Sequence, residues 1–232
     1  MIDVRPFASL GRFDIDWLAA RHHFSFGHYN DPKRMGVGAL RVWNDDTIQP
    51  GTGFDPHPHR DMEIITYVRK GAITHRDRLG NEGRTEAGDV QVMSAGTGIV
   101  HAEYNLEDDA TQIFQIWIIP SATGFEPRWE ARQFPKDDRA GELVVLASGR
   151  PGDDDALRIN QDAAVLGATV KAGQSVTHQL GAGRKAYLVA STGSITVNGA
   201  PAAARDGVVV SGEDSIEIRA VEDAEIVLVD VP

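Results

Sequence analysis

The chain contains no cysteine among its 232 residues. A disulfide framework and a cysteine-ligated zinc site are therefore both excluded, and the composition is compatible with a reducing compartment. The sequence also lacks an apolar stretch of eighteen residues, and its start lacks the basic and apolar regions of a signal peptide. We therefore expect a cytoplasmic protein that does not interact with membranes.

Basic residues are too few and too scattered to form a polyanion-binding surface. Lys and Arg number 23 against 34 Asp and Glu, which gives a formal net charge of -11. Contacts with a phosphate backbone need clustered Lys and Arg, so a direct nucleic-acid partner is not expected. The acidic surplus is spread in short pieces that solvate loops.

Convincing helical patterns are also scarce. The 24 glycines and 11 prolines separate short runs rich in Val, Ile, Thr and aromatic residues, a texture that predicts an all-β protein. The clearest expected strands cover residues 40–44, 62–68, 72–77, 89–93 and 112–119. A further strand is predicted at residues 24–26, and a short helix over residues 14–22, where Asp14 or Asp16 offers an N-cap.

A faint internal repeat indicates two domains. Residues 67–74 resemble residues 187–196, and residues 87–94 resemble residues 206–211 in the same order. A polar segment at residues 133–141 lies between the copies and suits a linker. Repetition in this order suggests a duplicated β-domain. We expect an N-terminal domain over residues 1–135 and a C-terminal domain over residues 136–232.

Three of the eight histidines lie in two short motifs, His57-Pro-His59 and His101-Ala-Glu103, and the second motif adds one carboxylate. In a strand, residues two apart point to the same face. Three neutral imidazoles and one carboxylate form a donor set that suits a divalent transition metal. A lone His-x-His more often represents two ordinary histidines. The recurrence of the spacing favours the metal interpretation.

The other histidines are interpreted more conservatively. The second repeat offers only His178, so it is expected to lack a metal site. His22, His23 and His75 are interpreted as structural or surface residues. Several apolar residues either line a pocket above the metal or pack an ordinary core: Phe24, Phe26, Met93, Phe114 and Trp117.

Both histidine motifs resemble the two conserved motifs of cupins. The first is carried by Gly51, His57, His59 and Glu63, with its closing glycine one position late at Gly71. The second is carried by Gly88, Ser94, Gly96, His101 and Asn105, with Ser in place of the usual Pro and two residues inserted before the histidine. Within cupins, the segments 57–63, 93–99 and 101–103 resemble the pirin family, and the resemblance covers most of residues 15–130. It implies two jelly-roll-like cupin barrels in tandem, a bicupin, with metal in the N-terminal barrel only.

Spacing alone leaves two candidates for the carboxylate ligand, Glu63 and Glu103. The resemblance to pirins implies that the metal ligands are His57, His59, His101 and Glu103, with Glu63 in a supporting role. Asn105 is interpreted as a turn or supporting residue. One divalent metal is expected. Iron is the first choice, and Ni, Mn, Co, Cu and Zn are alternatives, because the ligands do not select among them.

The resemblance implies two functions of different classes. Several bacterial pirins are quercetin 2,3-dioxygenases, which open a flavonol ring with O2 and release CO, whereas eukaryotic pirins have been assigned a metal-dependent regulatory binding role. We favour the enzyme, with a flavonol-like aromatic substrate and Glu103 as the base for its 3-hydroxyl, because no partner motif is visible. The alternatives are a non-enzymatic, pirin-like binding protein and a purely structural metal enclosed by four ligands. A monomer is compatible with the sequence.

Overall fold

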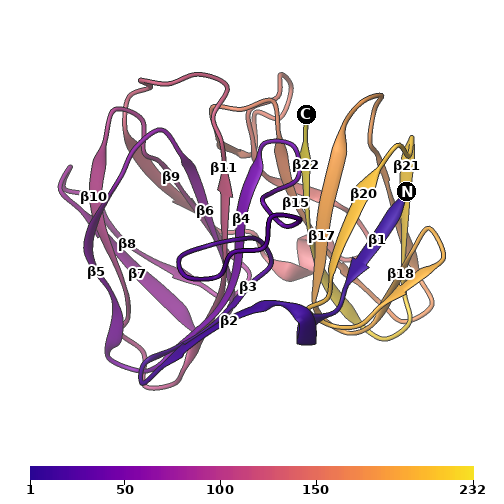
Figure 1. Ribbon diagram of the computed structural model, residues 1–232, viewed down its shortest axis with the longest axis horizontal. Helices are drawn as coiled ribbons and strands as arrows, with labels where there is room; N and C mark the ends of the chain where they lie inside the picture. The colour runs from indigo at the N-terminus through magenta and orange to yellow at the C-terminus, as the bar shows by residue number, and fades with distance from the viewer.

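Two β-barrels lie side by side in the structure, a computed structural model that describes residues 1–232 (Figure 1). Each barrel is formed by one seven-stranded sheet and one four-stranded sheet. Only two short 3-10 helices occur, η1 (Phe7–Ser9) and η2 (Lys136–Arg139). No helix has the length and apolarity needed to cross a membrane. The all-β, two-barrel prediction is confirmed.

The N-terminal barrel is made by strands that lie between residues 11 and 132. Its large sheet has the spatial order β12 (Arg128–Arg132), β9 (Val90–Ser94), β6 (Glu63–Lys70), β11 (Thr111–Ile118), β4 (Leu40–Ile48), β3 (Leu18–His22) and β2 (Gly11–Ile15). Its small sheet has the order β5 (Thr52–His59), β10 (Ile99–Asn105), β7 (Ala72–Asp77) and β8 (Glu82–Glu86).

The C-terminal barrel repeats this plan. Its large sheet has the order β1 (Ile2–Arg5), β20 (Gly207–Ser211), β17 (Lys185–Thr192), β22 (Ala224–Val231), β15 (Ala164–Val170), β13 (Val144–Ser148) and β14 (Leu157–Arg158). Its small sheet has the order β16 (Ser175–Gln179), β21 (Ser215–Ala220), β18 (Ile195–Val197) and β19 (Ala200–Ala202). Pairing is antiparallel in both barrels except between β13 and β14.

The internal repeat corresponds to equivalent strands. Tyr67 on β6 and Tyr187 on β17 lie at the same place in the two large sheets, each strand flanked by β9 and β11 or by β20 and β22. Tyr67 pairs with Val90, and Tyr187 pairs with Val209. The two repeated segments therefore align through both the sequence and the strand register.

The first strand of the chain joins the second barrel. β1 pairs with β20 along its whole length, from Ile2 opposite Val210 to Arg5 opposite Gly207. Residue 135 remains our proposed boundary between the domains, with β1 as an added strand of the C-terminal barrel. The polar segment at this boundary is anchored, because the buried Arg139 donates hydrogen bonds to the Tyr67 hydroxyl and the Gly88 carbonyl.

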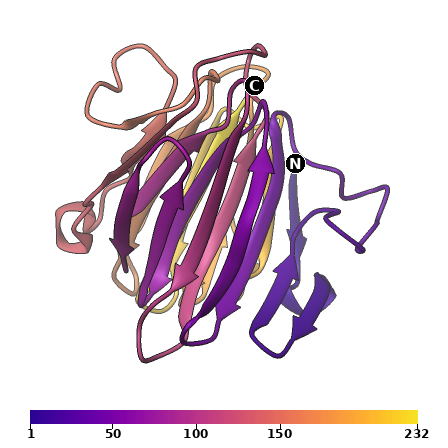
Figure 2. The same cartoon turned by 90° about the vertical axis from the view of Figure 1, so that its left-hand side faces the viewer.

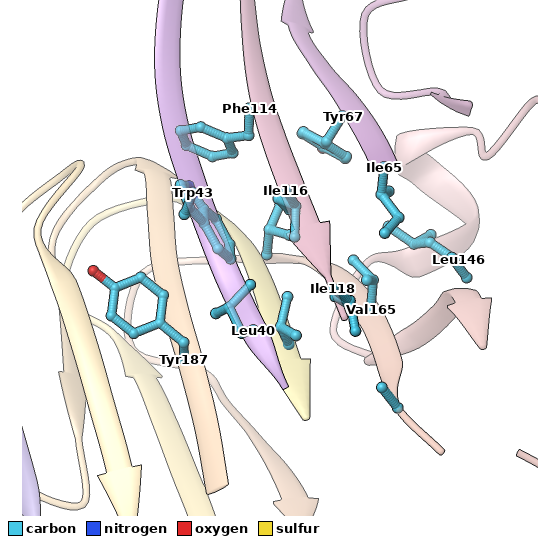
Figure 3. Close-up of a cluster of buried hydrophobic side chains, with 14 of the residues drawn as sticks. Leu40, Trp43, Ile65, Tyr67, Phe114, Ile116, Ile118, Leu146, Val165 and Tyr187 are labelled. Carbon is cyan, nitrogen blue, oxygen red and sulfur yellow. The ribbon is translucent and has the colours of Figure 1, made fainter. Parts of the chain in front are cut away.

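The largest core lies between the barrels rather than inside either one. The two seven-stranded sheets face each other, and Figure 2 shows the strands of the first in front of the yellow strands of the second. A cluster of 24 buried residues from both sheets fills the interface. At its centre, the Trp43 ring lies 5.3 Å from Phe114 and 5.5 Å from Tyr187 (Figure 3). Burial of this apolar area holds the barrels together.

The interiors of the two barrels differ. A cluster of 20 buried apolar residues fills the C-terminal barrel. The N-terminal barrel contains only two small clusters, of six and four residues. Its interior therefore has room for buried polar side chains and for a cavity.

Two local predictions were wrong. Residues 14–22 form no helix, because β2 and β3 make a hairpin in which Leu18, Ala20 and His22 alternate toward the interior. Burial of every second residue is typical of a half-buried strand. This pattern determines the local structure, although Asp14 and Asp16 could have capped a helix. Residues 24–26 form no strand either: the segment follows β3 as irregular backbone, with an isolated bridge from Phe26 to Tyr29.

Candidate metal centre

Three of the predicted ligands meet inside the N-terminal barrel. Strands β5 and β10 are neighbours in the small sheet, and their register places His101 opposite His57. The period of two along β5 brings His59 to the same face. One ring nitrogen from each of His57, His59 and His101 lies within 4.8 Å of the others, and the Nε2 atoms of His57 and His101 are 3.2 Å apart.

The hydrogen bond at the far side of the His57 ring fixes its tautomer. Its Nδ1 lies 2.7 Å from the backbone carbonyl oxygen of Asp55. A carbonyl can only accept, so Nδ1 carries the proton and Nε2 presents a lone pair to the cluster. This assignment follows from the hydrogen-bond partners.

A relay of two buried residues orients His101 in the same way. His75 Nε2 lies 3.0 Å from the Asp77 carboxylate, so this nitrogen donates and His75 Nδ1 is an acceptor. His101 Nδ1 lies 3.4 Å from His75 Nδ1 and therefore donates to it. His101 Nε2 is left with a lone pair toward His57. The His75 ring is held by stacking on Trp129, 4.8 Å away.

This arrangement suits a bound cation. Burial and the neighbouring imidazoles lower the pKa of His59 to about 4 and the pKa of His101 to about 2, so both rings are neutral at pH 7. The lone pairs of His57 and His101 then face each other at 3.2 Å. A metal ion between them would relieve that repulsion, and three neutral imidazoles are a common ligand set for divalent transition metals.

Glu103 lies deeper, behind His101. It belongs to a second group of potential ligands, with His75 and His101, whose donor atoms also lie within 4.8 Å of one another. Its Oε1 accepts hydrogen bonds from Gln91 at 2.5 Å and Thr66 at 3.2 Å, and its Oε2 accepts one from Gln115 at 2.5 Å. Burial outweighs these three donors and raises the pKa of Glu103 to about 7.

These donors belong to a polar row that crosses the large sheet and that the sequence analysis missed. The row follows the register from β3 through β4, β11 and β6 to β9, and consists of His22, Asn44, Gln115, Thr66 and Gln91. Each member is a buried polar residue on a strand that also carries apolar residues. That signal is present in the sequence, but it becomes meaningful only when the strand register aligns the five positions.

The residues that hold Glu103 are themselves oriented. The carbonyl oxygen of the Gln91 amide accepts a hydrogen bond from the Thr85 hydroxyl at 3.1 Å. The corresponding oxygen of Gln115 accepts from the Trp117 indole N–H at 3.2 Å. Each amide nitrogen is thereby turned toward Glu103.

Other candidates from the sequence lie elsewhere. Glu63 faces the interface between the barrels, where it accepts hydrogen bonds from Ser94 at 2.6 Å and Asn160 at 3.0 Å. Asn105 ties a turn together through the carbonyls of Ile48 and Asp109, as expected.

Three further histidines lie in the N-terminal barrel interior or at the interface between the barrels. His22 contacts Asn44 in the polar row at 2.8 Å, and the fully buried His23 contacts the Tyr187 hydroxyl at 2.7 Å between the barrels. His75, expected to be structural, contacts His101 directly.

The histidines line a cavity of about 510 Å³, here called the histidine chamber. Two edge-to-face aromatic pairs, Trp17 with Phe54 and Phe26 with Trp117, contribute its apolar walls, each with ring centres 5.3 Å apart. Of the residues for which pocket and core were both open, Phe26 and Trp117 line the pocket, whereas Phe24 and Phe114 pack between the barrels and Met93 lies in a small core cluster. The volume is typical of a small-molecule site.

Two family models match different parts of the chain. The pirin model matches residues 3–118, and the model described as the quercetinase C-terminal cupin domain matches residues 145–231. The molecule is therefore a two-domain protein of the cupin type. The chain belongs to the pirin family.

Full-length relatives support this assignment. The chain is 62% identical to a putative quercetin 2,3-dioxygenase of Pseudomonas aeruginosa, covering 100% of both chains. It is 42% identical to a quercetin 2,3-dioxygenase of Escherichia coli, covering 100% of this chain and 99% of the relative. The crystal structure of the bacterial pirin YhhW from Escherichia coli in complex with nickel(II) has a TM-score of 0.94 at 39% identity, covering 100% of this chain and 99% of the other.

Proposed function

We propose that this protein is a metal-dependent dioxygenase that opens the ring of a flavonol with O2 and releases CO. The single observation that carries the proposal is the convergence of three imidazoles and a buried carboxyl group on an aromatic-walled chamber. Such a site can hold a metal beside an aromatic substrate. Relatives named as quercetin 2,3-dioxygenases support this choice of chemistry.

His57, His59, His101 and Glu103 are the proposed metal ligands. When bound, the metal would supply Lewis acidity toward the enolic oxygens of the substrate and the redox capacity needed to use O2. A nickel-bound pirin structure supports including nickel beside iron among the metals to be tested.

Glu103 is the proposed base for the flavonol 3-hydroxyl. In the metal-free protein burial raises the pKa of Glu103 to about 7, which favours uptake of a proton by its carboxylate. Gln91 and Gln115 hold the carboxylate in one orientation, so it is positioned before substrate enters. The oxygen Oε2 accepts only one hydrogen bond, so its remaining acceptor site is the one that Glu103 can offer to a metal or to the substrate proton.

The aromatic walls would bind the flat substrate and limit the entry of water. Trp117 contributes twice, because its ring contacts Phe26 and His59 while its N–H orients Gln115. Its ring centre lies 4.9 Å from that of His59. Substrate position and the orientation of the base are thus linked through one side chain.

The test is an oxygen-dependence experiment on protein loaded with a single defined metal. Samples reconstituted with Fe(II), Ni(II), Mn(II), Co(II), Cu(II) or Zn(II) are given quercetin under air and under nitrogen, and flavonol loss and CO release are measured. We expect loss and CO only under air, and only with metal present. Fully metallated protein that consumes no flavonol with any metal would contradict the proposal and favour the metal-dependent binding protein.

A further inference from the structure

A second cavity, of about 500 Å³, adjoins the histidine chamber. We call it the hairpin chamber, because the β2–β3 hairpin supplies Phe13, Leu18 and Ala20 to its wall. The two chambers share four lining residues: Phe26, Asn44, Asp46 and Phe54. None of the three clustered histidines lines the hairpin chamber. The space beside the proposed metal therefore continues past the shared residues, away from the ligands.

Asp46, at the boundary of the chambers, is a buried acid without a complementary partner. Its side chain belongs to a residue that is 3% exposed, and its Oδ1 has no hydrogen-bond partner in the protein. Its neighbours across the sheet are Ala20 and Ile113, whose side chains cannot donate a hydrogen bond.

The adjacent acid behaves in the opposite way. Asp45 faces the interface between the barrels and forms ion pairs with Arg69 and Arg205. The absence of a partner for Asp46 is thus local to the chamber. Leaving a buried polar atom unpaired is unfavourable, so the position of Asp46 on a cavity wall suggests a partner outside the chain.

We propose that the hairpin chamber receives a second, hydroxyl-bearing aromatic ring of the substrate, and that Asp46 hydrogen-bonds one of its hydroxyl groups. This inference rests on the proposed function, because the histidine chamber must hold the metal-chelating part of the same molecule. The substrate class is then a hydroxyketone with a pendant hydroxylated aryl ring. Such a ring is joined by a single bond and can turn to pass the residues that the chambers share.

The lining of the hairpin chamber combines aromatic residues with polar ones, because Arg12, His22, His28 and Asn44 line it beside Asp46. Phe13, Phe26, Tyr29 and Phe54 supply ring faces and edges around it. Ala20, which is buried on β3, leaves the space that a larger side chain would fill. Burial, followed by the charges of Asp45 and Glu103, raises the pKa of Asp46 well above its ordinary value. A neutral carboxyl group can both donate to and accept from a phenolic hydroxyl.

The experiment measures binding to the metal-loaded, full-length protein under nitrogen, so that no turnover is needed. Three probes are compared by tryptophan fluorescence or calorimetry. Maltol is a one-ring hydroxyketone that fits within the histidine chamber, galangin is a flavonol whose pendant ring lacks hydroxyls, and quercetin differs from galangin only in two hydroxyls on that ring.

The first variants address the hydrogen bond. Asp46→Val is expected to weaken quercetin binding about 5- to 10-fold, while galangin and maltol change less than about 2-fold. Asp46→Asn should retain most of the quercetin affinity, because a neutral amide also donates and accepts. Asp16→Asn, an exposed acid in the turn of the same hairpin, is the matched control and should change nothing.

The second variant blocks the chamber. Ala20→Phe is expected to weaken binding of both flavonols at least about 10-fold and to leave maltol binding intact. Thermal unfolding checks each variant, and Ala20→Val replaces Ala20→Phe if the larger side chain prevents folding, with a smaller loss in the same direction.

Each outcome bears on one of the two proposals. Maltol could bind while Asp46→Val and the Ala20 variant each change the affinity for all three probes by the same factor. In that case the hairpin chamber does not hold the pendant ring. If maltol fails to bind the metal-loaded wild-type protein, the proposed metal function is contradicted instead. If Asp46→Val weakens the binding of quercetin and galangin equally, Asp46 does not hydrogen-bond a hydroxyl of the pendant ring. The result for Ala20→Phe then decides whether the ring occupies the hairpin chamber.

Discussion

Gln115 on β11 and Asp230 on β22 occupy equivalent positions in the two barrels, but their side chains make different kinds of contact. Gln115 pairs with Thr66 and donates to Glu103. Asp230 pairs with Ala186 and accepts from His178 at 2.7 Å and from Arg184 at 2.6 Å. Gln115 therefore supports a candidate metal ligand, Glu103. Asp230 instead binds His178, the only histidine of the C-terminal barrel, in a cluster of charged side chains.

The rest of the row follows the same division. Asn44, Thr66 and Gln91 of the N-terminal barrel correspond by register to Ala164, Ala186 and Val210 of the C-terminal barrel. Apolar residues at these positions allow the C-terminal interior to pack as an ordinary core.

We predict one metal ion per chain, bound in the N-terminal barrel. His59→Ala should lose most of the metal, whereas His178→Ala, the matched control in the other barrel, should keep it. Metal content of protein purified without chelator and then dialysed provides the measurement. Two ions per chain, or loss of metal in His178→Ala, would show that the C-terminal barrel also binds metal.

The variants Glu103→Gln and Glu63→Gln should show which of the two carboxylates is needed for metal binding and turnover. Glu103→Gln keeps the size of the side chain but removes its charge and basic oxygen, so it should weaken metal binding and abolish flavonol turnover even in excess metal. Glu63→Gln should retain metal and turnover, because Glu63 contacts Ser94 and Asn160 at the barrel interface. The reverse order of activities would assign the site to Glu63.

Glu103 should also give the metal-free protein a characteristic pH dependence. Its folded pKa of about 7 lies above the usual value of 4.5, so between these values the folded state binds more protons than the unfolded state. Stability contributed by this group is therefore present at low pH and is lost as pH rises toward and past 7. Because Glu103→Gln removes this effect, its free energy of unfolding should rise relative to wild type between pH 5 and pH 8.

The expected relative gain is on the order of 2–3 kcal/mol. Urea unfolding in the presence of chelator at the two pH values measures it. The lowered pKa values of His59 and His101 are common to both proteins and largely cancel in the comparison. A difference between the proteins that stays constant from pH 5 to pH 8 would contradict the assignment of a raised pKa to Glu103.

Asp77→Asn should weaken metal binding about 10- to 100-fold, in the range typical of residues that orient a metal ligand. Asp77 fixes the tautomer of His75, which accepts from His101 and so directs the His101 lone pair toward the site. Competition with a chelator of known affinity measures the change. Glu82→Gln, which removes an exposed ion pair with Arg76 on the neighbouring strand, is the control and should have no effect.

The barrels should unfold as one unit. Tyr187→Ala removes a fully buried side chain from the shared core and should lower the free energy of unfolding by about 3–5 kcal/mol. The exposed Leu79→Ala should change it by less than about 0.5 kcal/mol. Denaturant unfolding followed by circular dichroism and tryptophan fluorescence should give one coincident transition. Two separated transitions in the wild type would show that the barrels are independent.

The sequence by itself determined the features that depend on local periodicity. Because alternate residues of a strand share a face, the spacing of His57 with His59 was enough to predict that their rings point together. Short apolar runs between turn residues predicted most strands, and the resemblance of the segments that begin at Tyr67 and Tyr187 predicted the duplication. The absence of cysteine and of basic clusters restricted the candidate chemistry without any structure.

The orientation of Glu63 was decided by the tertiary structure. Counting by twos from His59 places Glu63 on the metal side, but the extended backbone is interrupted at residues 60–62, where Asp61 adopts a φ of 45°. The chain passes there from the small sheet to the large one. The alternation of side chains along β5 therefore does not continue into β6, and Glu63 faces the other barrel. Parity predicts orientation only within an unbroken strand.

Contacts between distant strands could not be predicted from one sequence either. His75 meets His101 because β7 and β10 are neighbours, and the register places His75 opposite Glu103. The polar row and the unpaired Asp46 depend in the same way on which strands pair and on their exact alignment. Strand order is set by the packing of whole sheets, which is a property of the complete fold rather than of any local sequence pattern.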